Sequence, residues 1–299
     1  MVLNIKDNSL VTVIIPVYNG QETIKNTIES VQKQTYSNFE LIVVDNGSTD
    51  DTITIVSKLV DSDPRIRLIH SKKGRSIARN VGLNSARGKY INFLDADDEF
   101  TTEHIERSVV FLDSHPKYFA YSEGVKYVDT EGQIVSVGVE NSDLEQLKFH
   151  NIFEISAVLF RKENNIEPFD EKLSHNEDWL FWAQNLDKRQ VFQNSKIIGE
   201  NKYITGKNTM SDMDNMIGSE IIVLSFLNSR VNLVRSIGLI TMFLNSRYSN
   251  EERFVTVVSE KHPFFFFILK GMFHYSFSKK IINSIVSRKI KSIQEAGFY

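Results

Sequence analysis

The sequence predicts an α/β fold, with a mostly parallel, doubly wound half-sheet flanked by helices. Between residues 11 and 94, short apolar runs alternate with longer amphipathic segments, which is typical of strand–helix–strand units. The chain has 299 residues and is 41% hydrophobic, so it can bury a large core. From about residue 212 the pattern is helical to the end. We therefore expect an α/β domain over residues 1–211 and a helical region over residues 212–299.

The elements of the first hundred residues follow from continuous apolar runs and from helical spacing. Runs that are apolar without alternation are typical of strands covered on both faces, and they predict strands at Val11–Val17, Phe39–Val44, Ile66–His70 and Tyr90–Leu94. Apolar residues at helical spacing predict helices over Thr23–Gln34, Thr52–Leu59 and Ile77–Ala86, the last with Ser76 as its N-cap.

After residue 100 the pattern predicts that the sheet becomes mixed. A helix is expected over Thr102–Leu112, and the turn Asp129–Gly132 should join two strands. The strands and the last helix of this part are expected at Phe119–Val128, Ile134–Val139, Ile155–Phe160 and Glu177–Leu186.

Composition excludes several classes of function. The net charge is −3 and the pI is near 6.2, so no global basic field points to nucleic acid as a partner. The chain has no cysteine, which excludes disulfides, thiolate nucleophiles and Cys-bound zinc. Residues 1–10 lack the apolar stretch of a secretory signal, and no run of about 20 apolar residues follows. We therefore expect a cytoplasmic protein whose metal chemistry, if present, uses Asp, Glu or His.

The acidic segment Asp95-Ala96-Asp97-Asp98 directly follows the fourth predicted strand. Ligands of open α/β sheets bind outside the carboxyl ends of the strands, and carboxylates there suit Mg²⁺ or Mn²⁺ together with substrate phosphates. The alternative is that Asp97 or Asp98 turns the chain and caps the helix that begins near Thr101 or Thr102. The segment alone does not decide between the two.

Four motifs in order along the chain resemble glycosyltransferase family 2. They are Pro16-Val17-Tyr18-Asn19, the segment Val44–Asp51, the segment Gly74–Gly82, and Asp95–Asp98, and the resemblance covers roughly residues 11–211. It implies a GT-A fold, a nucleotide-diphosphate sugar as donor, a divalent Mn²⁺ or Mg²⁺ ion, and transfer with inversion at the anomeric carbon. The chain lacks the Gln-x-x-Arg-Trp motif of processive relatives, so addition of a single sugar is expected.

The resemblance also implies roles for individual residues. Asp45 would accept the N3 proton of uracil, Arg79 would face the nucleotide, and Asp97 would bind the metal. Asn46 stands where many relatives have Asp, which leaves the preference for uridine less fixed. The nucleotide-binding residues implied in this way are Pro16, Tyr18, Asn19, Asp45, Asn46, Arg79, Asp95, Ala96 and Asp97, with Asp98 in support.

Two of these residues also have a purely structural explanation. Asn46, Gly47 and Ser48 can form an Asx turn after the second strand. Arg79 can be a surface cation on an exposed helix face.

The pair Glu177-Asp178 matches the acidic pair at the start of the acceptor-side helix in this family. We expect Asp178 to be the general base, with Glu177 as the alternative. The structural reading is helix N-terminal charge, with Asn176 or Ser174 as the cap. Trp182 is expected in the core, while Trp179 can either pack there or stack on a sugar.

Two parts of the chain depart from the family or extend it. Gly206 stands where many relatives have a histidine at the diphosphate, and Lys207 is a hypothetical substitute as a point charge. Residues 263–293 combine a phenylalanine run with basic residues, which suits a peripheral contact with an anionic membrane. Packing of this segment on the main domain or on a second subunit of a homo-oligomer is the alternative.

The sequence thus predicts a metal-dependent, inverting glycosyltransferase that uses a nucleotide-diphosphate sugar, most simply a UDP-sugar. The acceptor is expected to be a saccharide or a lipid-linked saccharide of a surface glycan. One alternative is a family member that binds nucleotide or glycan without turnover. The other is a sugar nucleotidyltransferase, which should carry a Gly-rich triphosphate loop that residues 16–23 do not supply.

Overall fold

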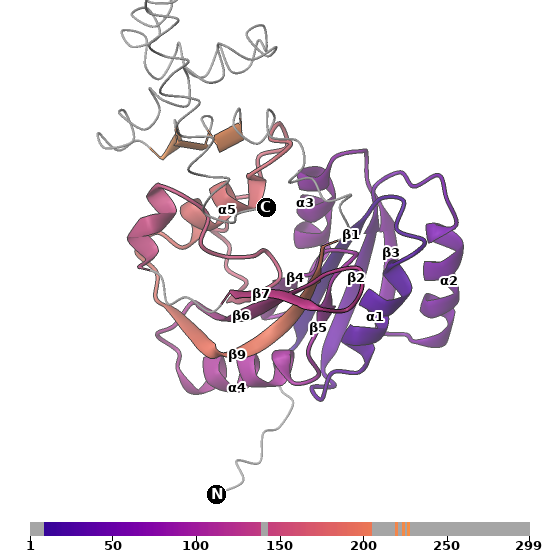
Figure 1. Cartoon of the computed structure of the whole chain (residues 1–299), viewed down its shortest axis with the longest axis horizontal. Helices are drawn as coiled ribbons and strands as arrows, with labels where there is room; N and C mark the ends of the chain where they lie inside the picture. Colours follow the sequence, from indigo (N-terminus) through magenta and orange to yellow (C-terminus); the bar gives the residue numbers. More distant parts are fainter. Residues whose placement is uncertain (1–8, 139–142, 205–218, 221–222, 225, 228–299) are drawn as a thin grey trace, which may run out of the picture. The chain divides into compact units, whose positions relative to one another are not determined.

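The computed structural model describes residues 9–138, 143–204, 219–220, 223–224 and 226–227 (Figure 1). The chain divides into two units, residues 1–147 with 151–208 and residues 148–150 with 209–299. The boundary predicted near residue 211, Gly206, Lys207 and the segment 263–293 lie outside the described residues. The candidate site lies within the first unit.

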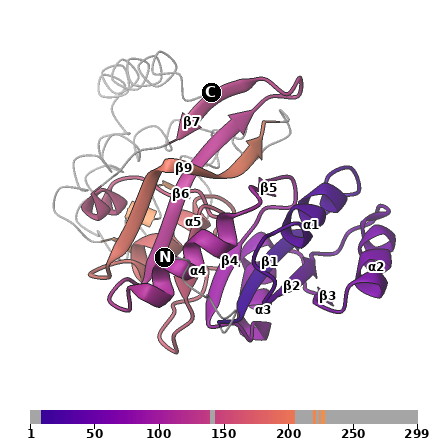
Figure 2. The ribbon, with the colours of Figure 1, turned by 90° about the horizontal axis from the view of Figure 1, so that it is seen from below.

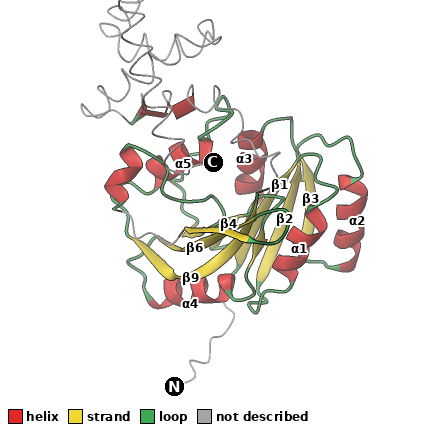
Figure 3. Cartoon of the chain, in the orientation of Figure 1, coloured by secondary structure: helices red, strands yellow, loops and turns green. Residues whose placement is uncertain are grey.

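The first unit is a mixed nine-stranded sheet flanked by helices, as the sequence predicts (Figure 3). Its strand order is β3-β2-β1-β4-β8-β6-β9-β5, and β7 pairs with β6. Strands β1 to β4 are parallel to one another, β8 is antiparallel to β4 and β6, and β9 is parallel to β6. The strands are β1 (Val11–Val17), β2 (Phe39–Asp45), β3 (Ile66–His70), β4 (Tyr90–Phe93), β5 (Glu99–Phe100), β6 (Ala120–Val128), β7 (Ile134–Gly138), β8 (Val158–Arg161) and β9 (Val191–Tyr203).

Helices pack against both faces of the sheet. Successive residues of a strand point to opposite faces, so an apolar strand such as β1 presents apolar side chains on both. Val13 and Ile15 of β1 belong to a core cluster that also takes apolar side chains from α1, α2 and α4. On the other face, Gly82 of α3 lies so close to Ile14 that an added Cβ would be 2.3 Å from its Cγ2. The helices are α1 (Ile24–Gln32), α2 (Thr52–Ser62), α3 (Arg75–Ser85), α4 (His104–Ser114) and α5 (Glu177–Asn185), with a 3₁₀ turn at Leu144–Lys148.

The structure corrects three local expectations. Helix α3 begins at Arg75 with Gly74 (φ 147°) before it, so Ser76 is not its N-cap. Helix α4 begins at His104 with no side-chain cap, so neither Asp97 nor Asp98 caps it. Strand β8 begins at Val158 rather than at residue 155.

Strand β9 is the largest element that the sequence analysis missed. Its 13 residues are mostly polar and half-buried, so neither an apolar run nor a clean alternation marks it. Figure 2 shows it running beside β6 for the length of both strands. It also pairs with the short strand β5, which follows the acidic turn directly.

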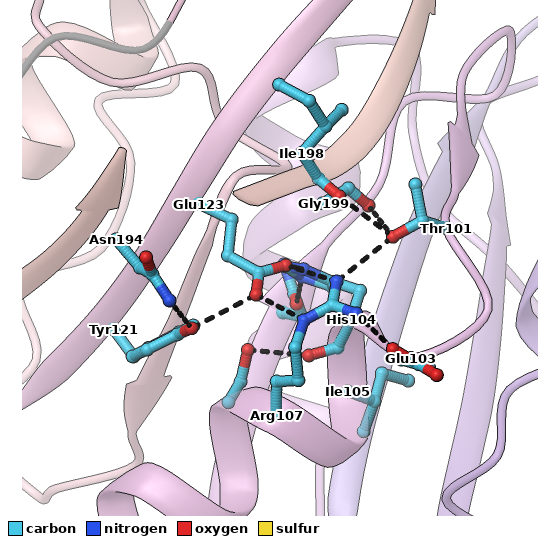
Figure 4. Close-up of polar contacts among 12 residues, drawn as sticks. Thr101, Glu103, His104, Ile105, Arg107, Tyr121, Glu123, Asn194, Ile198 and Gly199 are labelled. Atoms are coloured by element: carbon cyan, nitrogen blue, oxygen red, sulfur yellow. Dashed lines mark hydrogen bonds and ion pairs between the residues drawn. The ribbon is translucent and has the colours of Figure 1, made fainter. Parts of the chain in front are cut away.

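A buried polar network ties α4 to β4 and β6 (Figure 4). His104 Nδ1 lies 2.9 Å from Glu123 Oε2, and His104 Nε2 lies 2.9 Å from Asn92 Oδ1. Glu123 also accepts hydrogen bonds from Arg107 Nε at 2.6 Å and from the Tyr121 hydroxyl at 3.0 Å. The Asn92 amide nitrogen donates to main-chain carbonyls, so its oxygen faces the imidazole. Both ring nitrogens of His104 therefore lie within hydrogen-bond distance of a buried oxygen, which fixes the orientation of the ring.

Candidate active site

The predicted site residues gather at the carboxyl ends of the parallel strands. The segment after β1, the turn after β2 and the acidic turn after β4 lie at this edge, where β1 residue Val17 stands opposite Asp45. Asp45 in turn stands opposite His70 of β3. The edge is the position at which open α/β sheets bind ligands.

Asp45 forms the turn that the sequence analysis assigned to Asn46. Its buried carboxylate accepts the N–H groups of Gly47 at 3.2 Å and Ser48 at 3.1 Å, and lies 3.3 Å from His70 Nδ1. Burial works to raise the pKa of Asp45, but the bonds from Ser48, His70 and Gly47 together lower it, so the group is an ionised acceptor. Asn46 instead accepts the Gly74 N–H at 2.6 Å, which fixes the entry to α3.

The segment after β1 presents one aromatic ring to solvent. Tyr18 is 43% exposed, and the Lys73 ammonium lies 4.5 Å from its ring centroid. Asn19 has a positive φ of 50° and accepts the Thr49 N–H at 2.8 Å, so it joins the first turn to the second. Pro16 is buried within β1, opposite Val44 of β2.

Arg79 lies at the centre of the site and is only 2% exposed. It donates from one nitrogen to Glu177 Oε1 and from the other to Asp95 Oδ1, each at 2.8 Å. Burial works to lower the pKa of Arg79, but Asp95 and Glu177 raise it above its ordinary value. The reading of Arg79 as a surface cation is therefore wrong, and the residue joins the acidic turn to α5.

The acidic turn divides its carboxylates between different partners. Asp98 is buried and accepts the Tyr203 N–H at 3.0 Å, while the Ala96 carbonyl accepts the Thr27 hydroxyl at 2.9 Å. Burial would raise the pKa of Asp95, but Arg79 and other cations lower it to about 2. Burial and the charge of Asp95 raise the pKa of Asp97. The turn is thus held in place through Ala96 and Asp98.

The acidic pair at the start of α5 splits into two different environments. Glu177 is 3% exposed and accepts Arg79, and its Oε1 lies 3.5 Å from an Arg75 nitrogen. Asp178 accepts the Asn151 amide at 2.9 Å and the Trp179 N–H at 2.8 Å. Burial and the charge of Glu177 raise the pKa of Asp178 to about 6. A carboxylate with that pKa is suited to take a proton near neutral pH.

The aromatic and polar neighbours of this pair are structural. Trp182 is fully buried, as predicted, and Trp179 is 2% exposed and donates its Nε1 proton to the Leu147 carbonyl at 2.6 Å. The indole of Trp179 therefore packs in the core, which decides between its two readings. Asn176 precedes α5 with a φ of 55° and forms no side-chain cap bond, so it does not cap the helix as that reading supposed.

Lys202, Glu154 and Glu200 belong to the same region and were missed by the sequence analysis. The Lys202 ammonium lies 2.9 Å from Glu154 Oε2, 3.5 Å from Asp98 Oδ2 and 3.9 Å from Asp95 Oδ2. Glu200 accepts the Ser156 hydroxyl at 2.6 Å, and burial raises its pKa to about 7. Their one sequence signal is a Glu and a Lys two residues apart in a polar segment.

The residues of the acidic turn fit a divalent ion that is completed by substrate phosphates. Across the described ranges, no group of three or more Asp, Glu or His side chains is arranged to hold a metal by itself. Asp95 and Asp98 are engaged by Arg79, Lys202 and a main-chain N–H, which leaves Asp97 as the carboxylate of the turn for an ion. Mg²⁺ and similar ions commonly bind through one or two carboxylates plus phosphate oxygens.

Among the residues that the structure describes, no helix has the length and apolar character of a membrane span.

Comparisons with known proteins agree with this architecture. The family model described as glycosyl transferase family 2 matches residues 12–170. The chain is 36% identical over 198 residues to UDP-Glc:alpha-D-GlcNAc-diphosphoundecaprenol beta-1,3-glucosyltransferase WfaP of Escherichia coli, a match that covers 63% of this chain and 75% of that protein.

Two solved structures share the fold. The first is S. aureus TarS 1-349 in complex with UDP-GlcNAc, with a TM-score of 0.60, 22% identity, and coverage of 97% of this chain and 92% of that chain. The second is the mannosyltransferase PcManGT from Pyrobaculum calidifontis in complex with GDP-Man and Mn²⁺, with a TM-score of 0.57, 15% identity, and coverage of 95% and 87%. At these identities the structures support the GT-A-like fold that the sequence predicts.

Proposed function

The chain belongs to glycosyltransferase family 2 and is a glycosyltransferase, and from this we propose that it transfers one sugar, with inversion, from a UDP-sugar to a lipid-linked saccharide. The name of the E. coli relative specifies a UDP-glucose donor and a diphosphoundecaprenol-linked acceptor, and TarS was solved with UDP-GlcNAc. The observation that carries the proposal is the buried Arg79, which connects the acidic turn to the helix of Asp178. Membership of the family decides against the sugar nucleotidyltransferase.

The proposed general base is Asp178. An inverting transfer needs a carboxylate on the face opposite the leaving group, where it removes the proton of the attacking hydroxyl. Among the described residues, the hydrogen-bond donors to Asp178 are the neutral Asn151 amide and the Trp179 N–H. Its raised pKa of about 6 makes it a stronger base than an ordinary Asp. The acceptor hydroxyl would donate to the Asp178 carboxylate and attack the anomeric carbon. The bond from that carbon to the diphosphate oxygen would break, UDP would leave, and the proton of the hydroxyl would stay on Asp178.

Glu177 acts differently in this proposal. Its carboxylate forms an ion pair with Arg79 at 2.8 Å and a longer one with Arg75 at 3.5 Å, so it is an anchor for these cations rather than a base. The fixed position of Arg79 also orients Asp95, which we assign to the ribose side of the donor. Through Arg79, Glu177 thereby fixes the position of Asp95 on the donor side relative to Asp178 on the acceptor side.

Nucleoside recognition is assigned to the turns after β1 and β2. Asp45 is an ionised acceptor held rigidly by its turn, which suits the N3–H of uracil. Asn46 is committed to the Gly74 N–H, so the Asp-to-Asn departure at this position alters the entry to α3 rather than removing the base contact. Tyr18 offers an exposed ring for stacking.

We assign Mn²⁺ or Mg²⁺ to Asp97. Such an ion, when bound, stabilises negative charge on the departing diphosphate. PcManGT, which shares the fold, was solved with Mn²⁺ and GDP-Man. Because a lipid-linked acceptor is confined to a membrane, we place the enzyme in the cytoplasm at the inner membrane face.

Calorimetric titration of UDP and of GDP tests the donor site directly. We expect UDP to bind in the presence of Mn²⁺, to bind at least tenfold more weakly in EDTA, and to lose the metal effect in Asp97→Ala. Asp61→Ala, on the exposed face of α2, is the matched control. Binding of GDP in preference to UDP would overturn the uridine assignment.

Turnover is tested separately. Release of UDP from UDP-glucose or UDP-GlcNAc in the presence of a lipid-linked acceptor is expected. Nucleotide binding without any release would favour the non-catalytic alternative.

A further inference from the structure

Lys202 occupies an unusual position for a lysine. It lies near the end of β9, opposite Tyr127 of β6, and β9 pairs with β5 through Glu200 and Phe100. Because side chains alternate along a strand, Glu200 and Lys202 point to the same face. Strand pairing therefore brings a cation from the last part of the sheet to the acidic turn after β4.

The Lys202 ammonium is shared among three carboxylates. It lies 2.9 Å from Glu154, 3.5 Å from Asp98 and 3.9 Å from Asp95, and its side chain is only 14% exposed. Glu154 is held from its other oxygen by the Tyr127 hydroxyl at 2.7 Å. Burial works to lower the pKa of Lys202, but these carboxylates raise it well above its ordinary value, so the ammonium is permanently charged.

Three carboxylate oxygens thus converge within 4 Å of a single point, which the ammonium fills. Convergent carboxylate oxygens are what a hard divalent ion requires. The ammonium occupies that point, and across the described residues no group of three or more Asp, Glu or His side chains is arranged to hold a metal ion. Asp97 of the same turn stays outside these ion pairs.

We propose that Lys202 keeps divalent cations out of the Asp95, Asp98 and Glu154 cluster, so that an ion binds firmly at the neighbouring Asp97 only when the donor diphosphate supplies further oxygen ligands. This inference rests on the proposed metal-dependent function. Lys202 is then a positioning residue, because it sets the order in which metal and nucleotide are held and touches no reacting atom. By linkage, the factor by which the nucleotide strengthens metal binding equals the factor by which the metal strengthens nucleotide binding.

The test is direct measurement of Mn²⁺ binding, by electron paramagnetic resonance of the free ion, with and without UDP. For the wild-type protein we expect weak binding of Mn²⁺ alone and at least tenfold tighter binding with UDP. In Lys202→Met, Mn²⁺ alone should bind at least tenfold more tightly than in wild type, and the enhancement by UDP should shrink. Lys202→Arg keeps the charge and should behave as wild type.

Two further variants secure the interpretation. Lys89→Met removes an ammonium that pairs with Asp113 away from the acidic turn, and it should not change Mn²⁺ binding. Lys202→Gln is neutral but can still donate to Glu154, so the same gain in Mn²⁺ affinity is required of it if the methionine variant does not fold. Folding is checked by thermal melting in EDTA.

Each outcome bears on a distinct claim. Unchanged Mn²⁺ affinity in the neutral variants, or an affinity in Lys202→Arg as high as in Lys202→Met, would overturn the inference while wild-type binding with UDP left the proposed function standing. Absence of Mn²⁺ binding to the wild-type protein with UDP would overturn both the metal assignment and this inference.

Discussion

Replacement of Asp178 by Asn should abolish most turnover while leaving the fold intact. General-base catalysis typically contributes about 10²–10⁴-fold, which corresponds to about 3–5 kcal/mol of transition-state stabilisation. The Trp179 N–H can still donate to the Asn oxygen, so the start of α5 retains that contact. We therefore expect kcat to fall by this factor with little change in the KM for the donor.

The pH dependence of the wild-type enzyme follows from the environment of Asp178. Its pKa is raised from 3.8 to about 6 by burial and by Glu177. The ionised base is about half populated at pH 6 and about a tenth at pH 5, so kcat should fall about tenfold per pH unit below 6 and be level above pH 7. A continuous assay of UDP release at saturating donor and Mn²⁺ measures this profile.

Stability should move in the opposite direction to activity. Because the folded-state pKa of Asp178 lies above its unfolded value, the folded state binds the extra proton between pH 4 and 6, and its advantage is lost as the pH rises through that window. The shift of about two units corresponds to an upper bound of about 3 kcal/mol of destabilisation at pH 7. Asp178→Asn removes this destabilisation at pH 7, and loss of the Asn151 contact offsets part of the gain in stability. Urea unfolding at pH 7 should therefore find the variant no less stable than wild type.

Two results would refute this reasoning. A flat kcat profile between pH 5 and 7 would show that no group with a pKa near 6 limits the reaction. Retention of more than a tenth of wild-type kcat in Asp178→Asn would remove the base assignment. Asp61→Asn, on the exposed face of α2, should change neither quantity.

Three further changes test the surroundings of the site. Arg79→Lys cannot reach two carboxylates with one planar group, so it should lower kcat/KM by about ten- to a hundredfold and reduce stability, measured by kinetics and thermal melting. Glu123→Gln should cost about 3–5 kcal/mol in urea unfolding because it leaves the Arg107 guanidinium without its buried counter-charge. In the wild type the pKa of Glu123, lowered from 4.5 to about 2, predicts that its contribution is full above pH 4.5 and is lost as the pH falls toward 2. Gly82→Ala places a methyl 2.3 Å from Ile14 and should cost about 1–3 kcal/mol.

These expectations can each fail in a definite way. Wild-type kinetics in Arg79→Lys would mean that the two ion pairs do not set the active geometry. An unchanged urea midpoint in Glu123→Gln would show that the Arg107 guanidinium needs no buried counter-charge. For the glycine, Gly138→Ala is the control, since its added Cβ meets nothing nearer than 3.5 Å, and an equal effect of both changes would argue against a steric cause.

The sequence predicts the parallel half of the sheet well because β1, β2 and β4 are buried on both faces, while β3 is partly buried. A strand buried on both faces is mostly apolar, and β1 and β2 are buried along their whole lengths with Thr12, Glu40 and Asp45 as their polar residues. Strand β9 escapes the same reasoning because its residues are polar and half-exposed, and its position depends on pairing with β6 and β5 rather than on its own pattern.

The candidate site shows the same division between local and long-range information. The motif residues themselves could be read from the chain, but the partners of Arg79 are 16 and 98 positions away, so its burial could not. Asp45 rather than Asn46 forms the turn after β2, because Asn46 accepts the N–H of Gly74. The local sequence does not reveal that Gly74 lies this close. The position of Lys202 could not be predicted because the strand that carries it, β9, was not predicted.

The ion pairs and buried hydrogen bonds between distant parts of the chain have a consequence for recombination between relatives. Arg79 with Glu177, Lys202 with Asp98, and His104 with Asn92 each join a residue before position 99 to one after it. A chimaera that took its donor-binding part from one glycosyltransferase and its acceptor-binding part from another would bring these buried groups together from different parents. Only parents whose charges match across this seam would give a functional hybrid, so acceptor range in such enzymes should diversify through surface loops more readily than by exchange of halves.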